Sequence, residues 1–137
     1  MLRTATIIAA LGLAAALLPA TAQQSNIKRT MLQTVDFPPG FTTVSAVVEV
    51  APRGCAGSHT HPGVESTYVM EGEVVLKLDG EPDRVLKAGD SFQIPPGVVH
   101  DACVTNGSPV KLLATFVVEK GKALATPNPF LKARCYL

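Results

Sequence analysis

The chain has little of several features that would assign it to a particular class of protein. Its 137 residues include no tryptophan, only three cysteines and three histidines, and the formal charge is only +1. A charge this close to zero gives no electrostatic reason to expect nucleic acid or an anionic membrane as a partner. The absence of a C-x-x-C pair argues against a zinc knuckle or a thioredoxin-like redox site. A chain of this length accommodates one domain with one core.

The three cysteines permit at most one intramolecular bridge. Cys55 and Cys103 flank two histidine-containing segments and would meet if those segments pair as strands. Cys55 is four residues from His59, whereas Cys103 is three from His100, so in regular strands the two cysteines face opposite sides of the sheet. The sequence is therefore equally compatible with one bridge and with three thiols, Cys135 included.

Residues 1–22 show the three-part pattern of a secretory signal peptide. Arg3 supplies the positive start, residues 6–18 are apolar, Pro19 breaks the run, and residues 20–22 fit a small-x-small cleavage site. The apolar run is shorter than the about 20 residues that span a bilayer, which favours cleavage over a membrane anchor. We therefore expect a periplasmic or secreted protein that is not attached to a membrane after signal cleavage.

The remainder of the chain favours strands over helices. No later segment has a clear helical periodicity, and glycine and proline recur between short runs rich in β-branched residues. Val74, Leu76 and Leu78 alternate with Val75, Lys77 and Asp79 in a half-buried period-two pattern. Asp79-Gly80 is a hairpin signal. Many short strands of this kind predict an antiparallel sandwich or barrel.

These observations divide the chain into four parts. We expect a signal peptide at 1–22, an N-terminal arm at 23–40, a β-barrel at 41–120 and a C-terminal tail at 121–137. The tail carries Phe130, Leu131 and Tyr136, which we expect to pack on the barrel or against a second subunit.

All three histidines lie in two short segments. Residues two apart in a strand project from the same face, so His59 and His61 point the same way. The Pro-Gly pair after His61 predicts a bend that brings Glu65 beside them, and His100 arrives from a distant strand. Three imidazoles and one carboxylate suit a divalent first-row metal and leave one or two positions for other ligands.

Both segments resemble motifs of the cupin superfamily. "HTHPGVESTYVMEG" resembles the first motif, G-x5-H-x-H-x3,4-E-x6-G, in its spacing from His59 to Gly72, although Gly54 stands one residue too close to serve as the opening glycine. "GDSFQIPPGVVH" resembles the second, G-x5-P-x-G-x2-H-x3-N, with Val104 in place of the final asparagine. The resemblance covers residues 41–118 and is specific, because two multi-residue motifs occur in the right order.

The resemblance implies an all-β, antiparallel jelly-roll β-barrel, that of a small single-domain bacterial cupin of the quercetinase-like type. It implies that one divalent transition metal ion (Fe, Mn, Ni, Cu or Zn) is held by His59, His61, Glu65 and His100. The sequence does not select among these ions, because identical ligands serve several of them. Glu65 is also the candidate catalytic base. A homodimer and a small-molecule ligand or substrate are the implied partners.

Strand alternation from these four residues predicts the walls of the site. The side chains expected to face the cavity or to form its apolar wall are Thr67, Val69, Phe92, Ile94, Ala102 and Val104. Tyr68, Gln93 and Asp101 are candidates to support the ligands, though each also fits an ordinary surface or packing residue. The predicted pocket is mainly apolar, which favours an aromatic or enolic substrate over a polar sugar.

Three functions fit this site. The first is a dioxygenase acting on a small phenolic or enolic substrate. The second is a redox-neutral isomerase or lyase in which the metal polarises a carbonyl. The third is a non-catalytic module that binds a small molecule or a metal. Whether the protein is an enzyme is left open by the sequence.

Overall fold

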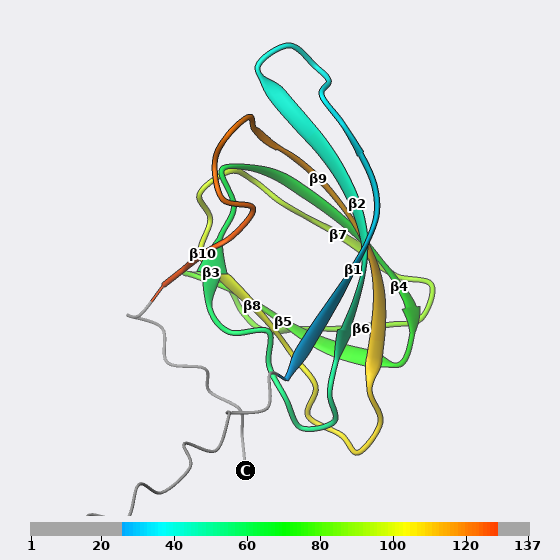
Figure 1. Ribbon diagram of the computed structural model, residues 1–137. Helices are drawn as coiled ribbons and strands as arrows, with labels where there is room; N and C mark the ends of the chain where they lie inside the picture. Colours follow the sequence, from blue (N-terminus) through cyan, green and yellow to red (C-terminus); the bar gives the residue numbers. More distant parts are fainter. Residues whose placement is uncertain (1–25, 129–137) are drawn as a thin grey trace, which may run out of the picture.

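The computed structural model describes residues 26–128, which form two antiparallel β-sheets that face each other (Figure 1). Sheet I has the strand order β1 (Ile27–Val35), β2 (Phe41–Val50), β9 (Val110–Glu119), β4 (Gly63–Glu71) and β7 (Ser91–Ile94). Sheet II has the order β10 (Thr126–Pro127), β3 (His59–Thr60), β8 (His100–Cys103), β5 (Glu73–Leu78) and β6 (Arg84–Lys87). The predicted all-β fold is confirmed. Within 26–128 no helix has the length and apolarity to cross a membrane.

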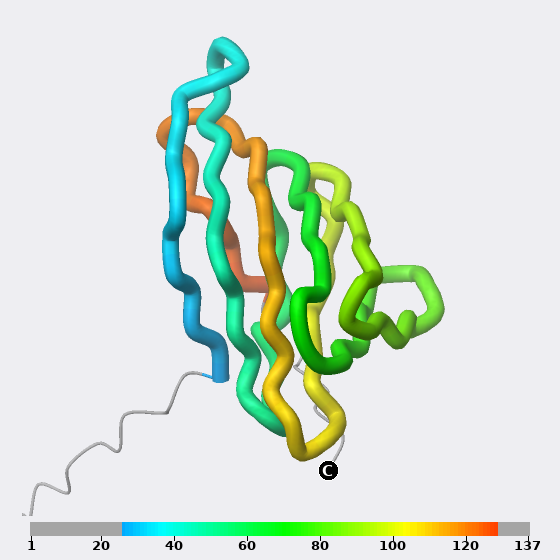
Figure 2. Tube along the Cα trace, turned by 90° about the vertical axis from the view of Figure 1, so that its right-hand side faces the viewer, coloured from blue at the N-terminus to red at the C-terminus, as the bar shows by residue number. Residues whose placement is uncertain are grey.

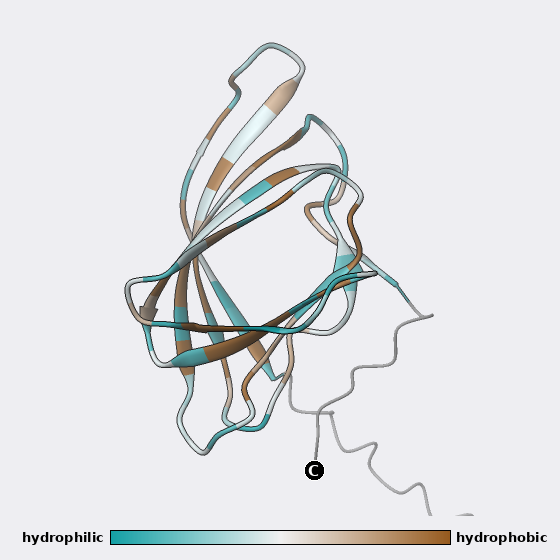
Figure 3. Ribbon diagram, turned by 180° about the vertical axis from the view of Figure 1, so that it is seen from behind, coloured by the Kyte–Doolittle hydropathy of each residue, from teal (hydrophilic) through white to brown (hydrophobic). Residues whose placement is uncertain are grey.

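Along the two ten-residue strands of sheet I, β2 and β9, buried residues alternate with more exposed ones. Along β2, Val44, Ala46, Val48 and Val50 are buried, and the residues between them are partly exposed. These alternating strands lie side by side in Figure 2, and their apolar residues appear along the ribbons in Figure 3. The buried faces of both sheets form one hydrophobic core.

Strand β1 lies inside the predicted N-terminal arm, where the sequence analysis places no strand. It pairs antiparallel with β2 and continues the sheet by one strand at its edge. The β1–β2 hairpin extends beyond the rest of the barrel in Figures 1 and 2. A register shift between Met31 and Gln33 interrupts the two-residue period, which explains why alternation does not reveal this strand.

The buried inner residues of β2, β9 and β7 are apolar, whereas β4 carries the polar residues Glu65 and Thr67 on this face. The pairing register aligns Val44, Phe116, Glu65 and Ile94 across four strands. Glu65 is 7% exposed, so a carboxylate occupies a core position in this row. Two of the residues predicted to face the cavity or form its wall, Phe92 and Ala102, line the cavity beside the cluster. All six are buried: Thr67, Val69, Phe92, Ile94, Ala102 and Val104.

The chain crosses from sheet II to sheet I between His61 and Glu65. Pro62 bends the chain there, as predicted, and β4 begins at Gly63. A Cβ atom at Gly63 would collide with the carbonyl oxygen of Val117, so only glycine lets the strands approach this closely. This crossing places His59 and Glu65 on opposite walls of the barrel although they are six residues apart.

Cys55 and Cys103 form a disulfide bridge, so one of the two alternatives for the cysteines holds within the described residues. The parity argument against this pair does not apply, because the chain from Cys55 to His59 is not a regular strand. Cys55 makes an isolated β-bridge to Cys103, and Gly57 has a φ of +90°. The signal peptide, most of the C-terminal tail and Cys135 lie outside the described residues.

Candidate metal site

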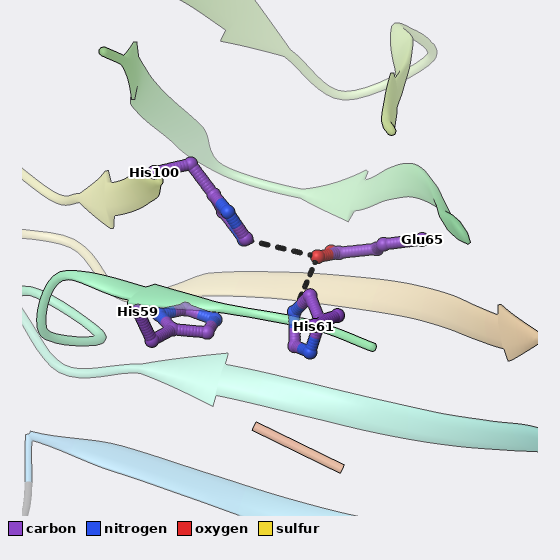
Figure 4. A group of neighbouring side chains, drawn as sticks. All are labelled: His59, His61, Glu65 and His100. Carbon is purple, nitrogen blue, oxygen red and sulfur yellow. Dashed lines mark ion pairs between the residues drawn. The ribbon is translucent and has the colours of Figure 1, made fainter. Parts of the chain in front are cut away.

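The four predicted metal ligands meet inside the barrel (Figure 4). His59 lies on β3, His61 follows that strand, His100 lies opposite His59 on β8, and Glu65 projects from β4. One potential ligand atom from each residue lies within 4.8 Å of the others. All four side chains are buried, so both sheets contribute to one enclosed cluster.

Each imidazole is fixed by a main-chain carbonyl. The Nδ1 atoms of His59 and His61 lie 2.6 Å from the carbonyl oxygens of Gly57 and Leu124, and Nδ1 of His100 lies 3.0 Å from that of Val98. A carbonyl oxygen only accepts hydrogen bonds, so we assign the ring hydrogen of each neutral histidine to Nδ1. The lone pair then resides on Nε2, the atom left for a metal.

Two of these Nε2 atoms face the carboxylate of Glu65. The Nε2 atoms of His61 and His100 lie 3.0 Å and 3.2 Å from Glu65 Oε2. Both nitrogens are buried and neither makes a hydrogen bond. Lone pairs on nitrogen and oxygen repel at this distance unless a proton or a cation lies between them. The donor set therefore fits a divalent cation.

The pKa of Glu65 lies well below its usual range. Burial alone would raise this pKa, but a proton between Glu65 and the facing His100 and His61 rings, at the place that a cation would take, and the Thr67 hydroxyl together outweigh burial. Burial lowers the pKa of His59 to about 4, so this imidazole is neutral at neutral pH. Thr67 Oγ1 donates to Glu65 Oε1 at 2.7 Å, which leaves Oε2 facing the histidines.

Asp101 supports the site indirectly, whereas Tyr68 and Gln93 do not reach it. Asp101 is buried, and its Oδ1 accepts a hydrogen bond from the Gly57 amide at 3.0 Å. The carbonyl of the same Gly57 anchors His59. Tyr68 is 48% exposed, and Gln93 is exposed and donates to Ser66 Oγ. The last two are ordinary surface residues, which is the alternative that the sequence left open.

A small cavity adjoins the four residues. Its volume is about 30 Å³, and its apolar walls include Val48, Val50, Leu76, Phe92, Ala102 and Phe116. The prediction of a mainly apolar pocket is confirmed. A water molecule needs about 10–15 Å³ measured in this way, so the enclosed part has room for very small ligands only. Phe116, whose ring centroid lies 4.8 Å from that of His61, was missed because only the β4–β9 register reveals its position.

Comparison with known protein families gives one match that spans most of the barrel. The sequence model of the Cupin domain family matches residues 46–118, more than half of the chain. Among curated proteins, germin-like protein subfamily 2 member 2 of Arabidopsis thaliana is 34% identical over 86 residues, covering 57% of this chain and 39% of that protein. Oxalate oxidase 2 of Hordeum vulgare is 36% identical over 73 residues, covering 45% of this chain and 33% of that protein. The chain thus spans less than half the length of these curated relatives.

Solved structures agree with the fold. A cupin-like protein from Thermotoga maritima superposes with a TM-score of 0.63 at 26% sequence identity, covering 74% of this chain and 75% of that one. This similarity supports the two-sheet β-barrel fold.

Proposed function

This chain is a member of the cupin family, and from that premise we propose that it is a metal-dependent dioxygenase acting on a small enolic or phenolic substrate. The proposed ligands of one divalent transition metal ion are His59, His61, Glu65 and His100. The observation that carries the proposal is the pair of buried, unpaired Nε2 atoms aimed at one carboxylate oxygen. Similarity to a barley oxalate oxidase supports oxygen-dependent chemistry.

An ion of iron, manganese, nickel or copper would supply Lewis acidity and electron transfer to dioxygen. The chain's own residues fix the positions of the proposed metal ligands. The carbonyls of Gly57, Leu124 and Val98 hold the three rings in one tautomer and one orientation. Apolar walls at the buried end of the cavity limit its contact with water and so strengthen the interactions there.

The role of Glu65 as a ligand is better supported than its predicted role as a base. Its pKa lies well below the usual range, so the carboxylate is a weak proton acceptor. Proton acceptance by Glu65 therefore remains a prediction. Glu65→Asp keeps the charge but shortens the reach, and a change in the pH dependence of turnover at unchanged metal content would support the catalytic role.

Elemental analysis is the first test of the metal centre. The untagged protein, purified from the compartment where it normally resides, is compared with His61→Ala. About one equivalent of iron, manganese, nickel or copper in the wild type, lost in the variant, would support the proposal. Oxygen uptake with small enols and with flavonols then tests the reaction, and the cavity of about 30 Å³ leads us to expect the small enols to be preferred.

Two other results would redirect the proposal. One equivalent of zinc without oxygen uptake would favour redox-neutral isomerase or lyase chemistry, or a non-catalytic binding role. Absence of metal from both proteins, together with no binding of added metal, would contradict the metal centre.

We also propose that the chain is exported to the periplasm or secreted. Its N-terminal pattern is that of a signal peptide, and the Cys55–Cys103 bridge suits an oxidising compartment. The mass of the protein from an extracytoplasmic extract tests this. A mature chain that begins after Ala22 is expected, and a full-length chain retained in the cytoplasm would contradict it.

A homodimer through the outer face of sheet I is a further part of this proposal. Tyr68 and Leu113 pair directly on that face and are 48% and 37% exposed, and Val64, four residues along β4 on the same face, is 38% exposed. An apolar patch of this kind is commonly covered by a partner. Light scattering should give twice the chain mass, and Leu113→Lys should give the monomer. A monomeric wild type would contradict the dimer.

A further inference from the structure

The cavity beside the candidate metal site has a closed end and an open end. The four clustered residues and the apolar wall residues are buried, whereas Ile27, Arg29 and Ala56, which also line the cavity, are partly or largely exposed. The cavity therefore opens toward the edge strand β1 and the segment that precedes β3. A ligand of more than a few atoms would bind with one end at the histidines and the other near this opening.

Arg29 gives the opening a positive charge. It pairs in register with Val48, whose side chain faces the cavity, so Arg29 lies on the inner face of β1. Its neighbour Lys28 lies on the outer face and pairs with Glu49 at 3.2 Å. Among residues 26–128, by contrast, no carboxylate forms an ion pair with Arg29. Histidines apart, Arg29 is the one basic residue in the described part of the chain that lines this cavity.

The charges of the cavity favour an anion. Glu65 contributes one negative charge, and the divalent ion of the proposed function would more than offset it. The Arg29 guanidinium, which has no ion pair with any of residues 26–128, adds a second positive region at the opening. Its planar fork matches a carboxylate better than an ammonium group would. No other side chain lining the open end is charged.

We propose that Arg29 is a specificity-determining residue that selects substrates carrying a carboxylate remote from the metal-bound oxygen. The inference rests on the proposed function and narrows its substrate class to small organic acids. One oxygen of the substrate occupies the metal end, and the carboxylate lies at the opening against the Arg29 guanidinium. The neutral enols and phenols of the same size are then the poorer ligands.

The test uses two probes of equal size on the full chain reconstituted with Co(II). Malonate and malonamate share one carboxylate for the metal and differ at the other end, which is a carboxylate in the first and a neutral amide in the second. Titration followed by calorimetry and by the visible absorption of Co(II) gives both dissociation constants. We expect malonate to bind about 10-fold or more tightly than malonamate, the usual strength of a hydrogen bond to a charged group.

Three variants separate the Arg29 interaction from the general attraction of the metal. Arg29→Gln should weaken malonate binding about 10-fold and leave malonamate and Co(II) binding nearly unchanged. Arg29→Lys should retain part of the preference because it retains the charge. Lys28→Gln, one residue away on the opposite face, should match the wild type.

The outcomes distinguish the two levels of the proposal. A wild type that binds no Co(II) would overturn the proposed metal centre and this inference with it. Normal Co(II) binding with equal affinity for the two probes would overturn the inference alone. The same would follow if Arg29→Gln kept the full preference for malonate or if Lys28→Gln lost it equally.

Discussion

Both sheets hold their parts of the candidate site by hydrogen bonds, but the partners are main-chain groups on the sheet II side and a side chain on sheet I. On the sheet II side, the three imidazoles are anchored by main-chain carbonyls. On sheet I, the carboxylate of Glu65 is anchored by the side chain of Thr67. A carbonyl anchor depends on the path of the backbone and survives most substitutions. A hydroxyl anchor depends on a single residue. The histidine half should therefore respond to changes in the backbone, and the carboxylate half to one substitution.

The largest effect is expected from removing the bridge that shapes the backbone on the sheet II side. Cys55 and Cys103 are 48 residues apart in sequence, and closing a loop of that length contributes about 4 kcal/mol to the free energy of unfolding. The double variant Cys55→Ser/Cys103→Ser should lose about this much in urea unfolding. It should also bind metal more weakly, because Gly57, the anchor of His59, lies close to the bridge.

Cys135→Ser, outside the described residues, is the matched control. It should unfold at the same urea concentration as the wild type. An equally stable double variant would show that the backbone near Gly57 is held without the bridge.

The second effect concerns acid stability of the metal-free protein. The pKa of His59 is about 4 in the folded chain and 6.5 ordinarily. Between these pH values the unfolded chain binds the additional proton, so the free energy of unfolding falls as the pH drops from about 6.5 to 4. The loss from His59 reaches up to about 3 kcal/mol. Glu65, whose pKa is lowered, adds a further loss below its ordinary value of 4.5.

Urea unfolding across this pH range measures the effect. His59→Gln should flatten the part of the profile above pH 4.5 while leaving the decline below it. A wild-type profile that is already flat from pH 6.5 to 4.5 would mean that His59 is protonated in the fold.

The third effect tests the side-chain anchor on sheet I. Thr67→Val keeps the shape but removes the hydroxyl that holds Glu65 Oε1, and such supporting contacts usually change metal affinity 10- to 100-fold. The pKa of Glu65 should rise as well, since Thr67 is among the groups that lower it. Competition with a chelator measures the affinity. Thr67→Ser, which retains the hydroxyl, should stay near the wild type, and equal losses in both variants would implicate packing instead.

The smallest effect is expected from a substitution at Ser66, the neighbour of Thr67 in the sequence. Ser66 lies on the outer face of sheet I, where its hydroxyl accepts from the Gln93 amide. Ser66→Ala should change the free energy of unfolding by no more than about 0.5 kcal/mol and leave metal affinity unaltered. A metal defect as large as that of Thr67→Val would mean that the two faces of β4 are coupled.

Local spacing, together with the resemblance to two cupin motifs, was enough to predict the contents of the cluster. Two histidines in alternation, a Pro-Gly bend and a distant histidine after a second turn are short-range patterns, and the structure brings His59, His61, Glu65 and His100 together. The same alternation identified buried side chains such as Thr67 and Phe92. Period-two arguments work here because β4 and β7 are regular where these residues lie.

The other parts of the site could not be predicted, because they depend on how the strands pair in register and on irregular backbone near Gly57. Phe116 and Arg29 reach the cavity only because β9 and β1 pair in particular registers, which no local pattern specifies. The bridge between Cys55 and Cys103 was left open because the parity count assumed an extended chain where Gly57 has a left-handed φ. Carbonyl anchors are likewise invisible in a sequence, since every residue has a carbonyl.

The crossing at Pro62 has a consequence for where the protein acquires its ion. His59 and His100 become neighbours only when β3 pairs with β8, and Glu65 joins them only when the other wall closes over the core. On the proposed ligand assignment, an unfolded chain has scattered donors and no site, so loading follows closure of the barrel. The ligands themselves discriminate weakly among first-row metals. The compartment in which the chain folds, through the ions it offers at that moment, therefore sets the identity of the metal.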